Sequence, residues 1–178
     1  MIRAEKARSG GAWEATHMTI ELEPLTRDNF HHACAIRRED IPEAFVDTAQ
    51  TLMELTEYAN AHRCIGRTFL AKADGAYVGL LLLGEAIPWE TDPEEMRKEP
   101  FYRLMGFVLD RAYRGQGLGG AILEQAIAQV CRDLGVRPIA LGCHKENVRA
   151  ARFYERHSFA RTGVFEGSDE YFLRYPQG

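Results

Sequence analysis

The sequence lacks several patterns that would place a protein in a special class. Its 178 residues carry a net charge of −4, so it lacks the basic excess that is typical of nucleic-acid-binding domains. Its apolar runs, such as "YVGLLLLG", are far too short to span a membrane. The N-terminus has no apolar signal-peptide core. We therefore expect a cytoplasmic protein without a nucleic-acid partner or a membrane segment.

The sequence is also poor in cysteine and histidine patterns. Its four cysteines are widely spread and none forms a C-x-x-C pair, so we expect reduced thiols, partly buried as small hydrophobic groups. His31 and His32 are adjacent, and neighbouring residues on a helix point in different directions. Neither residue type has the spacing of a zinc site, and we expect no bound metal.

Length and composition are those of one ordinary globular domain. The chain is 46% hydrophobic and 27% charged, which is close to the average for such domains. We assign residues 18–178 to a single domain. Residues 1–17 have no clear period and contain Ser-Gly-Gly, so we expect a tail there, either a cloning remnant or an alternative upstream start.

The order of hydrophobic patterns predicts a mixed α/β (α+β) fold. A strand is expected over 19–24, helices follow from Thr26 and over 48–62, and Asp74-Gly75 joins two strands as a hairpin. Later patterns complete the order β-α-α-β-β-β-α-β-α-β-β. The strands on either side of the long helix that ends near residue 134 are joined by a crossover. We therefore expect a mostly antiparallel sheet with one parallel strand pair.

One glycine-rich stretch, "RGQGLGG" at 114–120, stands between an expected strand and this helix. It fits G-x-G-x-x-G, but a dinucleotide-binding fold also needs a carboxylate at the end of the next strand. That strand ends in "LGCH", and no Gly-Lys-Ser/Thr supports a P-loop. A flexible turn or an anion site remains. Bare N–H groups at a helix N-terminus, with Arg111 and Arg114 nearby, suit a pyrophosphate.

Two segments together resemble the GCN5-related N-acetyltransferase family. "LDRAYRGQGLGGAIL" is similar to its motif A, Gln/Arg-x-x-Gly-x-Gly/Ala, and "NVRAARFYERHSF" is similar to its second signature. Ser158 departs from the second signature, because glycine is usual there. The element order agrees with the family over about residues 19–175. The matching positions are Arg114, Gly117 and Gly119 in the first segment, and Asn147, Ala150, Tyr154 and Phe159 in the second.

The resemblance implies a site for acetyl-coenzyme A between the two parallel strands. The backbone of Phe107, Val108 and Leu109 would pair with the pantetheine arm and the thioester, and one N–H group would polarise the acetyl carbonyl. Asn147 would bond the cofactor arm as well as cap its helix. The pyrophosphate would be held by Arg114 and by the N–H groups of Gly115, Gln116, Gly117, Leu118, Gly119 and Gly120.

The resemblance also implies direct transfer of the acetyl group to an amine. Tyr154 matches the family's general acid and would protonate the leaving thiolate. The general base stays open. Some family members carry a glutamate in the strand before the second signature, where this chain has Gly142. The remaining candidates are Glu85, an acidic loop and His144, acting directly or through water; alternatively, the amine loses its proton to solvent as it is desolvated.

The identity of the acceptor amine rests on two features. Residues 38–59 and 101–119 resemble bacterial spermine/spermidine acetyltransferases, and Trp89 and Tyr102 could contact a cation. The second feature is the loop over residues 85–100, which is rich in carboxylates. These carboxylates would attract a polycation or simply be solvated. We expect a polyamine; aminoglycoside, amino-acid or protein amines, or a non-catalytic acetyl-coenzyme A sensor, are alternatives. Family analogy suggests a homodimer. The loop carboxylates are Glu85, Glu90, Asp92, Glu94, Glu95 and Glu99.

Overall fold

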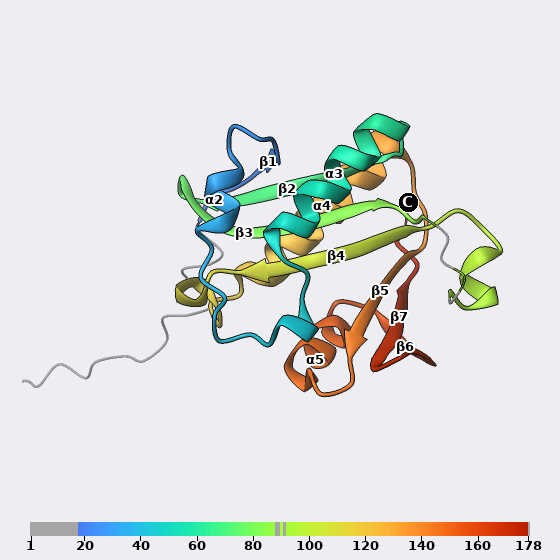
Figure 1. Ribbon diagram of the computed structural model, residues 1–178. Helices are drawn as coiled ribbons and strands as arrows, with labels where there is room; N and C mark the ends of the chain where they lie inside the picture. The colour runs from blue at the N-terminus through green and yellow to red at the C-terminus, as the bar shows by residue number, and fades with distance from the viewer. Residues whose placement is uncertain (1–17, 88–89, 91, 178) are drawn as a thin grey trace, which may run out of the picture.

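A single seven-stranded sheet organises the computed structural model, which describes residues 18–87, 90 and 92–177 (Figure 1). The strand order is β1-β2-β3-β4-β5-β7-β6, and every pair is antiparallel except β4 with β5. This arrangement confirms the predicted fold class and the predicted parallel pair. The strands are β1 (Ile20–Pro24), β2 (Gly66–Ala73), β3 (Ala76–Glu85), β4 (Tyr102–Leu109), β5 (Ile139–His144), β6 (Ala160–Glu166) and β7 (Asp169–Arg174).

The helices connect these strands in the predicted order. They are α2 (Phe30–Cys34), α3 (Ala49–His62), α4 (Leu118–Leu134) and α5 (Val148–Arg156), with short 3-10 helices η1 (Glu43–Phe45), η2 (Glu94–Arg97) and η3 (Arg111–Tyr113). No helix in the described part of the chain is long and apolar enough to cross a membrane.

The expected start of the first helix at Thr26 is wrong. The Thr26 N–H donates to Asn29 Oδ1 at 2.7 Å, and the Asn29 N–H donates back to Thr26 Oγ1 at 3.4 Å. These two reciprocal bonds have the pattern of a capping box, so Thr26 caps a single turn ahead of the regular helix. Residues 26–29 therefore form a turn, and α2 begins only at Phe30.

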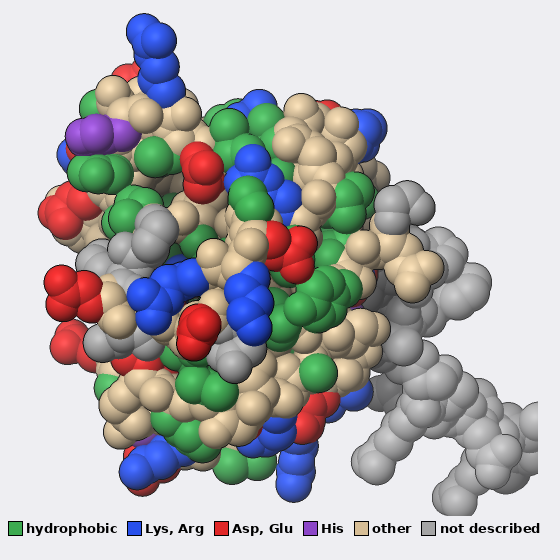
Figure 2. Space-filling view, turned by 90° about the vertical axis from the view of Figure 1, so that its right-hand side faces the viewer, with side chains coloured by type: hydrophobic (Ala, Val, Ile, Leu, Met, Phe, Trp, Pro, Cys, Tyr) green, Lys and Arg blue, Asp and Glu red, His purple; other side chains and the backbone are tan. Residues whose placement is uncertain are grey.

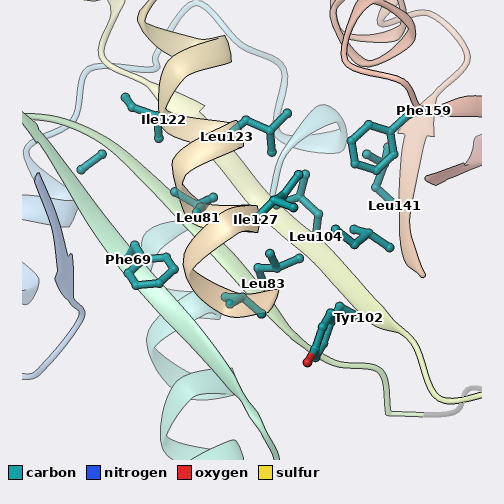
Figure 3. Packing of buried hydrophobic residues seen from close by; sticks show 14 of the residues in the cluster. Phe69, Leu81, Leu83, Tyr102, Leu104, Ile122, Leu123, Ile127, Leu141 and Phe159 are labelled. Atoms are coloured by element: carbon teal, nitrogen blue, oxygen red, sulfur yellow. The ribbon is translucent and has the colours of Figure 1, made fainter. Parts of the chain in front are cut away.

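Helices cover both faces of the sheet. Helix α4 packs Ile122, Leu123 and Ile127 against side chains of β2, β3 and β4 on one face (Figure 3). On the other face, α2 and α3 cover a second cluster that includes the fully buried Leu52 and Leu70. The alternation along β2 explains the layers, because Phe69 and Ala71 join the first cluster and Leu70 joins the second.

The parallel pair separates soon after it starts. Strands β4 and β5 pair only at Tyr102 with Ile139 and at Arg103 with Ala140, although β4 runs on to Leu109. Figure 1 shows the two strands diverging from there. The divergence leaves the C-terminal half of β4 open to groups other than a neighbouring strand.

A bulge at Gly106 lies in this half of β4. Leu82 of β3 pairs with Met105 and Leu80 pairs with Val108, so β4 has one residue more than β3 between these pairs. Gly106 has a φ of 60°, in the left-handed region that glycine adopts without strain. Bulges bend a strand and increase its twist. We infer that this bulge turns the end of β4 away from β5.

Candidate active site

The residues predicted to bind the cofactor gather around one cavity of about 720 Å³. It lies where the end of β4 meets the glycine-rich loop and α5. Gln116 and Leu118 do not line it: the Gln116 amide donates to the Ala112 carbonyl and the Leu118 side chain is fully buried. The other predicted residues, Phe107, Val108, Leu109, Arg114, Gly115, Gly117, Gly119, Gly120, Asn147 and Tyr154, all line this cleft.

The glycine-rich loop ends as the N-terminus of α4. Gly117 caps the helix with a φ of 81°, a conformation that a side chain would strain. The N–H groups of the first helical turn have no partner within a helix, and the helix dipole is positive at this end. Leu118, Gly119 and Gly120 form that turn. Their N–H groups can therefore hold an anion such as a pyrophosphate.

Arg114 is more strongly engaged by the protein than its motif position suggests. Its Nε donates to the Leu109 carbonyl at 2.9 Å and its guanidinium pairs with Asp40 at 2.6 Å. A third bond reaches the Arg37 carbonyl at 3.2 Å. Arg114 thus ties the end of β4 to the segment after α2, and Asp40 offsets part of its charge.

Two further arginines, neither of which belongs to a motif position in the sequence, line the cleft from α5. Arg149 and Arg156 are exposed, and neither forms an ion pair with a described residue. Their spacing of seven residues puts them on one side of a helix, which was the available signal. They supply positive charge that the site needs for a phosphate-bearing ligand, since Arg114 is partly neutralised.

Asn147 performs the capping role that was predicted for it. Its Oδ1 accepts a hydrogen bond from the Ala150 N–H at 3.2 Å, in the first turn of α5. The same side chain lines the cleft. The amide nitrogen therefore stays available as a donor to a ligand while the oxygen caps the helix.

Tyr154 is held by the end of α5. The Phe159 N–H bonds the Tyr154 carbonyl at 3.0 Å and the Ser158 N–H bonds the Glu155 carbonyl at 3.3 Å. This pair of bonds is a Schellman motif with Ser158 as its left-handed residue, φ 64°. The turn therefore forms although serine replaces the usual glycine. It places the Phe159 ring 5.6 Å from the Tyr154 ring, edge to face.

The environment of Tyr154 suits a proton donor. Burial, and then the nearby thiol of Cys143, raise the pKa of the Tyr154 phenol well above its usual range. The hydroxyl therefore keeps its proton at neutral pH. Tyr154 also lines a second cavity of about 390 Å³. Phe45, Val46 and Phe107 line both cavities as well, so the two meet around this tyrosine.

The second cavity is acidic, but its carboxylates differ from those expected. Glu85 accepts from the Ile65 N–H at 3.0 Å, and Asp92 is buried against Arg103 at 2.7 Å. Neither belongs to the described lining. Figure 2 shows the face of the molecule that includes part of the loop between β3 and β4. Basic and acidic side chains are interspersed on this face. The carboxylates that do line the cavity are Glu43, Asp47, Glu166 and Asp169.

Three other residues were candidates for the acceptor site: Tyr102, Trp89 and His144. Tyr102 is fully buried and donates to the Gly135 carbonyl at 2.8 Å, so its hydroxyl has a structural partner. Trp89 lies outside the described residues. His144 stacks against Phe45, with ring centroids 5.0 Å apart, and its Nδ1 accepts from the Glu146 N–H.

Several known proteins that resemble this chain are described as acetyltransferases. Over 153 residues the chain is 22% identical to the spermine/spermidine N(1)-acetyltransferase of Bacillus subtilis, covering 86% of this chain and 95% of that protein. Two solved structures share its fold at TM-scores of 0.68 and 0.61. The first is aminoglycoside acetyltransferase AAC(6′)-Ib with coenzyme A, 17% identical and covering 89% of this chain and 96% of that one. The second is the Vibrio cholerae spermidine N-acetyltransferase with coenzyme A and spermine, 16% identical and covering 88% and 94%.

The family model described as the acetyltransferase (GNAT) family matches residues 30–159, which is more than half of the chain. This range spans the cleft, the glycine-rich loop and α5 with Tyr154. The chain therefore belongs to the GNAT family, as an N-acetyltransferase whose co-substrate is acetyl-coenzyme A.

Proposed function

We propose that the acceptor of the acetyl group is a primary amine of a small polyamine such as spermidine or spermine. The observation that carries this proposal is the acidic cavity that meets the cofactor cleft at Tyr154. Among its described lining, four carboxylates face one arginine, Arg103, whose guanidinium is paired with Asp92. A cavity of this charge attracts a slender polycation and repels an anionic acceptor.

Residues that line the cleft would bind different parts of acetyl-coenzyme A. The N–H groups from Gly115 to Gly120 hold the pyrophosphate, and Arg149 and Arg156 add charge from α5. The backbone of Phe107, Val108 and Leu109 lies along the pantetheine arm and the thioester, because the diverging β5 leaves that edge of β4 without a neighbouring strand. Asn147 donates its amide to the same arm. The side chain of Arg114 acts mainly by fixing the loop.

Tyr154 supplies the proton for the leaving thiolate. It lines both cavities, which supports a role at the point where the thioester of the co-substrate would meet the acceptor amine. Its raised pKa keeps the phenol protonated before the transfer, as a general acid requires. The relatives in Bacillus subtilis and Vibrio cholerae are described as spermine or spermidine acetyltransferases, which supports the same acceptor class.

A thiol-release assay tests the acceptor. Purified chain and acetyl-coenzyme A are offered spermidine, spermine, aminoglycosides, amino acids and peptides with free amines, and kcat/KM is compared. We expect the highest value with a polyamine. A higher value with an aminoglycoside would contradict the proposal and favour the alternative that the AAC(6′)-Ib structure suggests. Tight cofactor binding without turnover on any amine would indicate a sensor.

A charge variant sharpens this test. Asp47→Asn removes one carboxylate from the cavity lining, and we expect KM for spermine to rise more than KM for a monoamine. Asp28 lies outside the lining and is exposed, so Asp28→Asn makes the same change in net charge away from the site. Equal effects of the two variants on spermine would show that the cavity does not bind the polycation.

A further inference from the structure

The carboxylate of Asp169 lies over the one residue of β5 that has no side chain. Asp169 opens β7 and pairs with His144 across the sheet, which makes it a diagonal neighbour of Gly142 on the same face. A Cβ built on Gly142 would lie 3.5 Å from Asp169 Cβ and 3.6 Å from its Oδ2. Both residues line the acceptor cavity. Asp169 therefore fills the space that a longer side chain at 142 would enter.

Two of the titratable groups near Asp169 already have hydrogen-bond partners. Tyr171 donates its hydroxyl to Glu166 Oε2 at 2.5 Å. His144 Nδ1 accepts the Glu146 N–H at 3.2 Å, so that ring nitrogen is already engaged. No described residue donates a hydrogen bond to the Asp169 carboxylate.

Its surroundings also make Asp169 a stronger base than an ordinary aspartate. Burial raises its pKa, and the carboxylates of Glu166 and Asp47 raise it further, while His144 lowers it. Cys143 points to the opposite face of β5 but is still close enough to interact: burial, and then Asp169, raise the pKa of that thiol to about 11, so the thiol stays neutral. A carboxylate with a raised pKa accepts a proton more readily at neutral pH.

We propose that Asp169 is the catalytic residue that takes the proton from the acceptor ammonium. The inference rests on the proposed acceptor cavity. Asp169 accepts one proton, directly or through one water, and frees the nitrogen lone pair. The C–N bond then forms as the C–S bond breaks, Tyr154 gives its proton to sulfur, and the surplus proton on nitrogen restores Tyr154. Asp169 finally releases its proton to solvent, so the steps balance.

Acceptors of graded basicity test this role. The series consists of analogues of the acceptor that the wild type prefers, with increasing numbers of fluorine atoms beside the amino group. Fluorine lowers the pKa of the ammonium group. The amine is then increasingly neutral at the assay pH and needs no base to remove a proton. We expect Asp169→Asn to lower kcat about 100-fold for the unfluorinated amine. The loss should shrink to a few-fold for an amine that is neutral at the assay pH. An equal loss across the series, or no loss, would overturn the proposal.

A transplanted carboxylate separates chemistry from structure. In the double variant Gly142→Glu/Asp169→Ala a carboxylate reaches the same space from β5, and Gly142 has no positive φ that a side chain would strain. We expect it to recover at least 10-fold of the kcat that Asp169→Ala loses, with acetyl-coenzyme A affinity unchanged. No recovery in a folded double variant would count against a base at this point.

A second control removes charge without removing the base. Glu166→Gln takes one carboxylate from the same cavity, and we expect a higher KM for the polycation with a loss of kcat that depends on amine basicity much less than the loss in Asp169→Asn does. A dependence equal to that of Asp169→Asn would overturn the assignment. If the wild type turns over only an aminoglycoside, the polyamine proposal fails and the comparison is made with that amine. No turnover on any amine rejects both.

Discussion

Gly106→Ala should destabilise the fold strongly although it adds a single methyl group. A Cβ there would lie 2.3 Å and 2.6 Å from the two terminal methyl carbons of Leu52, a fully buried residue of α3. A left-handed φ costs a non-glycine residue about 1–2 kcal/mol, and overpacking a core costs about 1–3 kcal/mol. The reduced entropy of the unfolded chain returns about 0.4–1 kcal/mol. Gly106→Ala should therefore lower the free energy of unfolding by about 2–4 kcal/mol.

Two companion variants separate these contributions. Gly75 also has a positive φ, 81°, but a Cβ there meets nothing within 4 Å, so Gly75→Ala reports the backbone strain alone. Leu52→Ala should cost about 2–5 kcal/mol as a cavity variant. Because it also removes the atoms that Gly106→Ala would strike, the double variant should lose at least ~1 kcal/mol less than the sum of the single losses.

Urea unfolding followed by circular dichroism measures all four variants against the wild type. The midpoint gives the change in stability where the slope is unchanged. Additive losses for Gly106→Ala and Leu52→Ala would show that the two side chains do not collide. A loss at Gly106 no larger than that at Gly75 would show that the tight contact across β4 and α3 has no energetic weight.

Three other changes have definite expected outcomes. Ser158→Gly should raise the thermal midpoint, because glycine relieves about 1–2 kcal/mol of left-handed strain, more than the about 0.4–1 kcal/mol that the greater entropy of the unfolded chain offsets, and the Schellman bonds stay unchanged. Tyr154→Phe should lower kcat about 100-fold with little change in acetyl-coenzyme A affinity measured by calorimetry; an unchanged kcat would remove its acid role. Asp110 is buried and bonded to Arg37 at 2.8 Å, which holds the pKa of that carboxyl well below its usual range. Such a carboxylate stabilises the fold above its unfolded pKa of about 3.9 and loses that effect as pH falls towards the folded value. Asp110→Asn should thus cost about 1–3 kcal/mol at pH 7 in chemical unfolding, and the deficit should shrink below about pH 4.

The sequence was sufficient where local chemistry decides the structure. Asp74 and Gly75 both adopt positive φ in the β2–β3 hairpin, as their turn type requires. Asn147 caps α5, and the glycine-rich loop opens α4. Each of these features depends on residues within a few positions of one another, so a short pattern determines it.

The acceptor side could not be read in the same way, because it depends on registers between distant strands. Asp169 approaches Gly142 only because β7 pairs antiparallel with β5 in one register. A shift by one residue would turn its carboxylate to the opposite face. Asp92 looked like a solvated loop residue, yet it is buried against Arg103 from the neighbouring strand. No spacing along the chain indicates either contact.

The bulge at Gly106 links the two halves of the site. Met105, on its N-terminal side, lines the acceptor cavity, and Val108, beyond it, lines the cofactor cleft. Phe107 lines both. Consecutive residues of β4 therefore form both the backbone proposed to hold the thioester and one wall of the acceptor cavity. The additional residue of the bulge sets the angle between these two parts of the strand. A change of that angle would displace the thioester carbon and the amine relative to each other. A folded Gly106 variant should consequently lose more in kcat than in affinity for either substrate, because catalysis depends on alignment within about 1 Å whereas binding tolerates more.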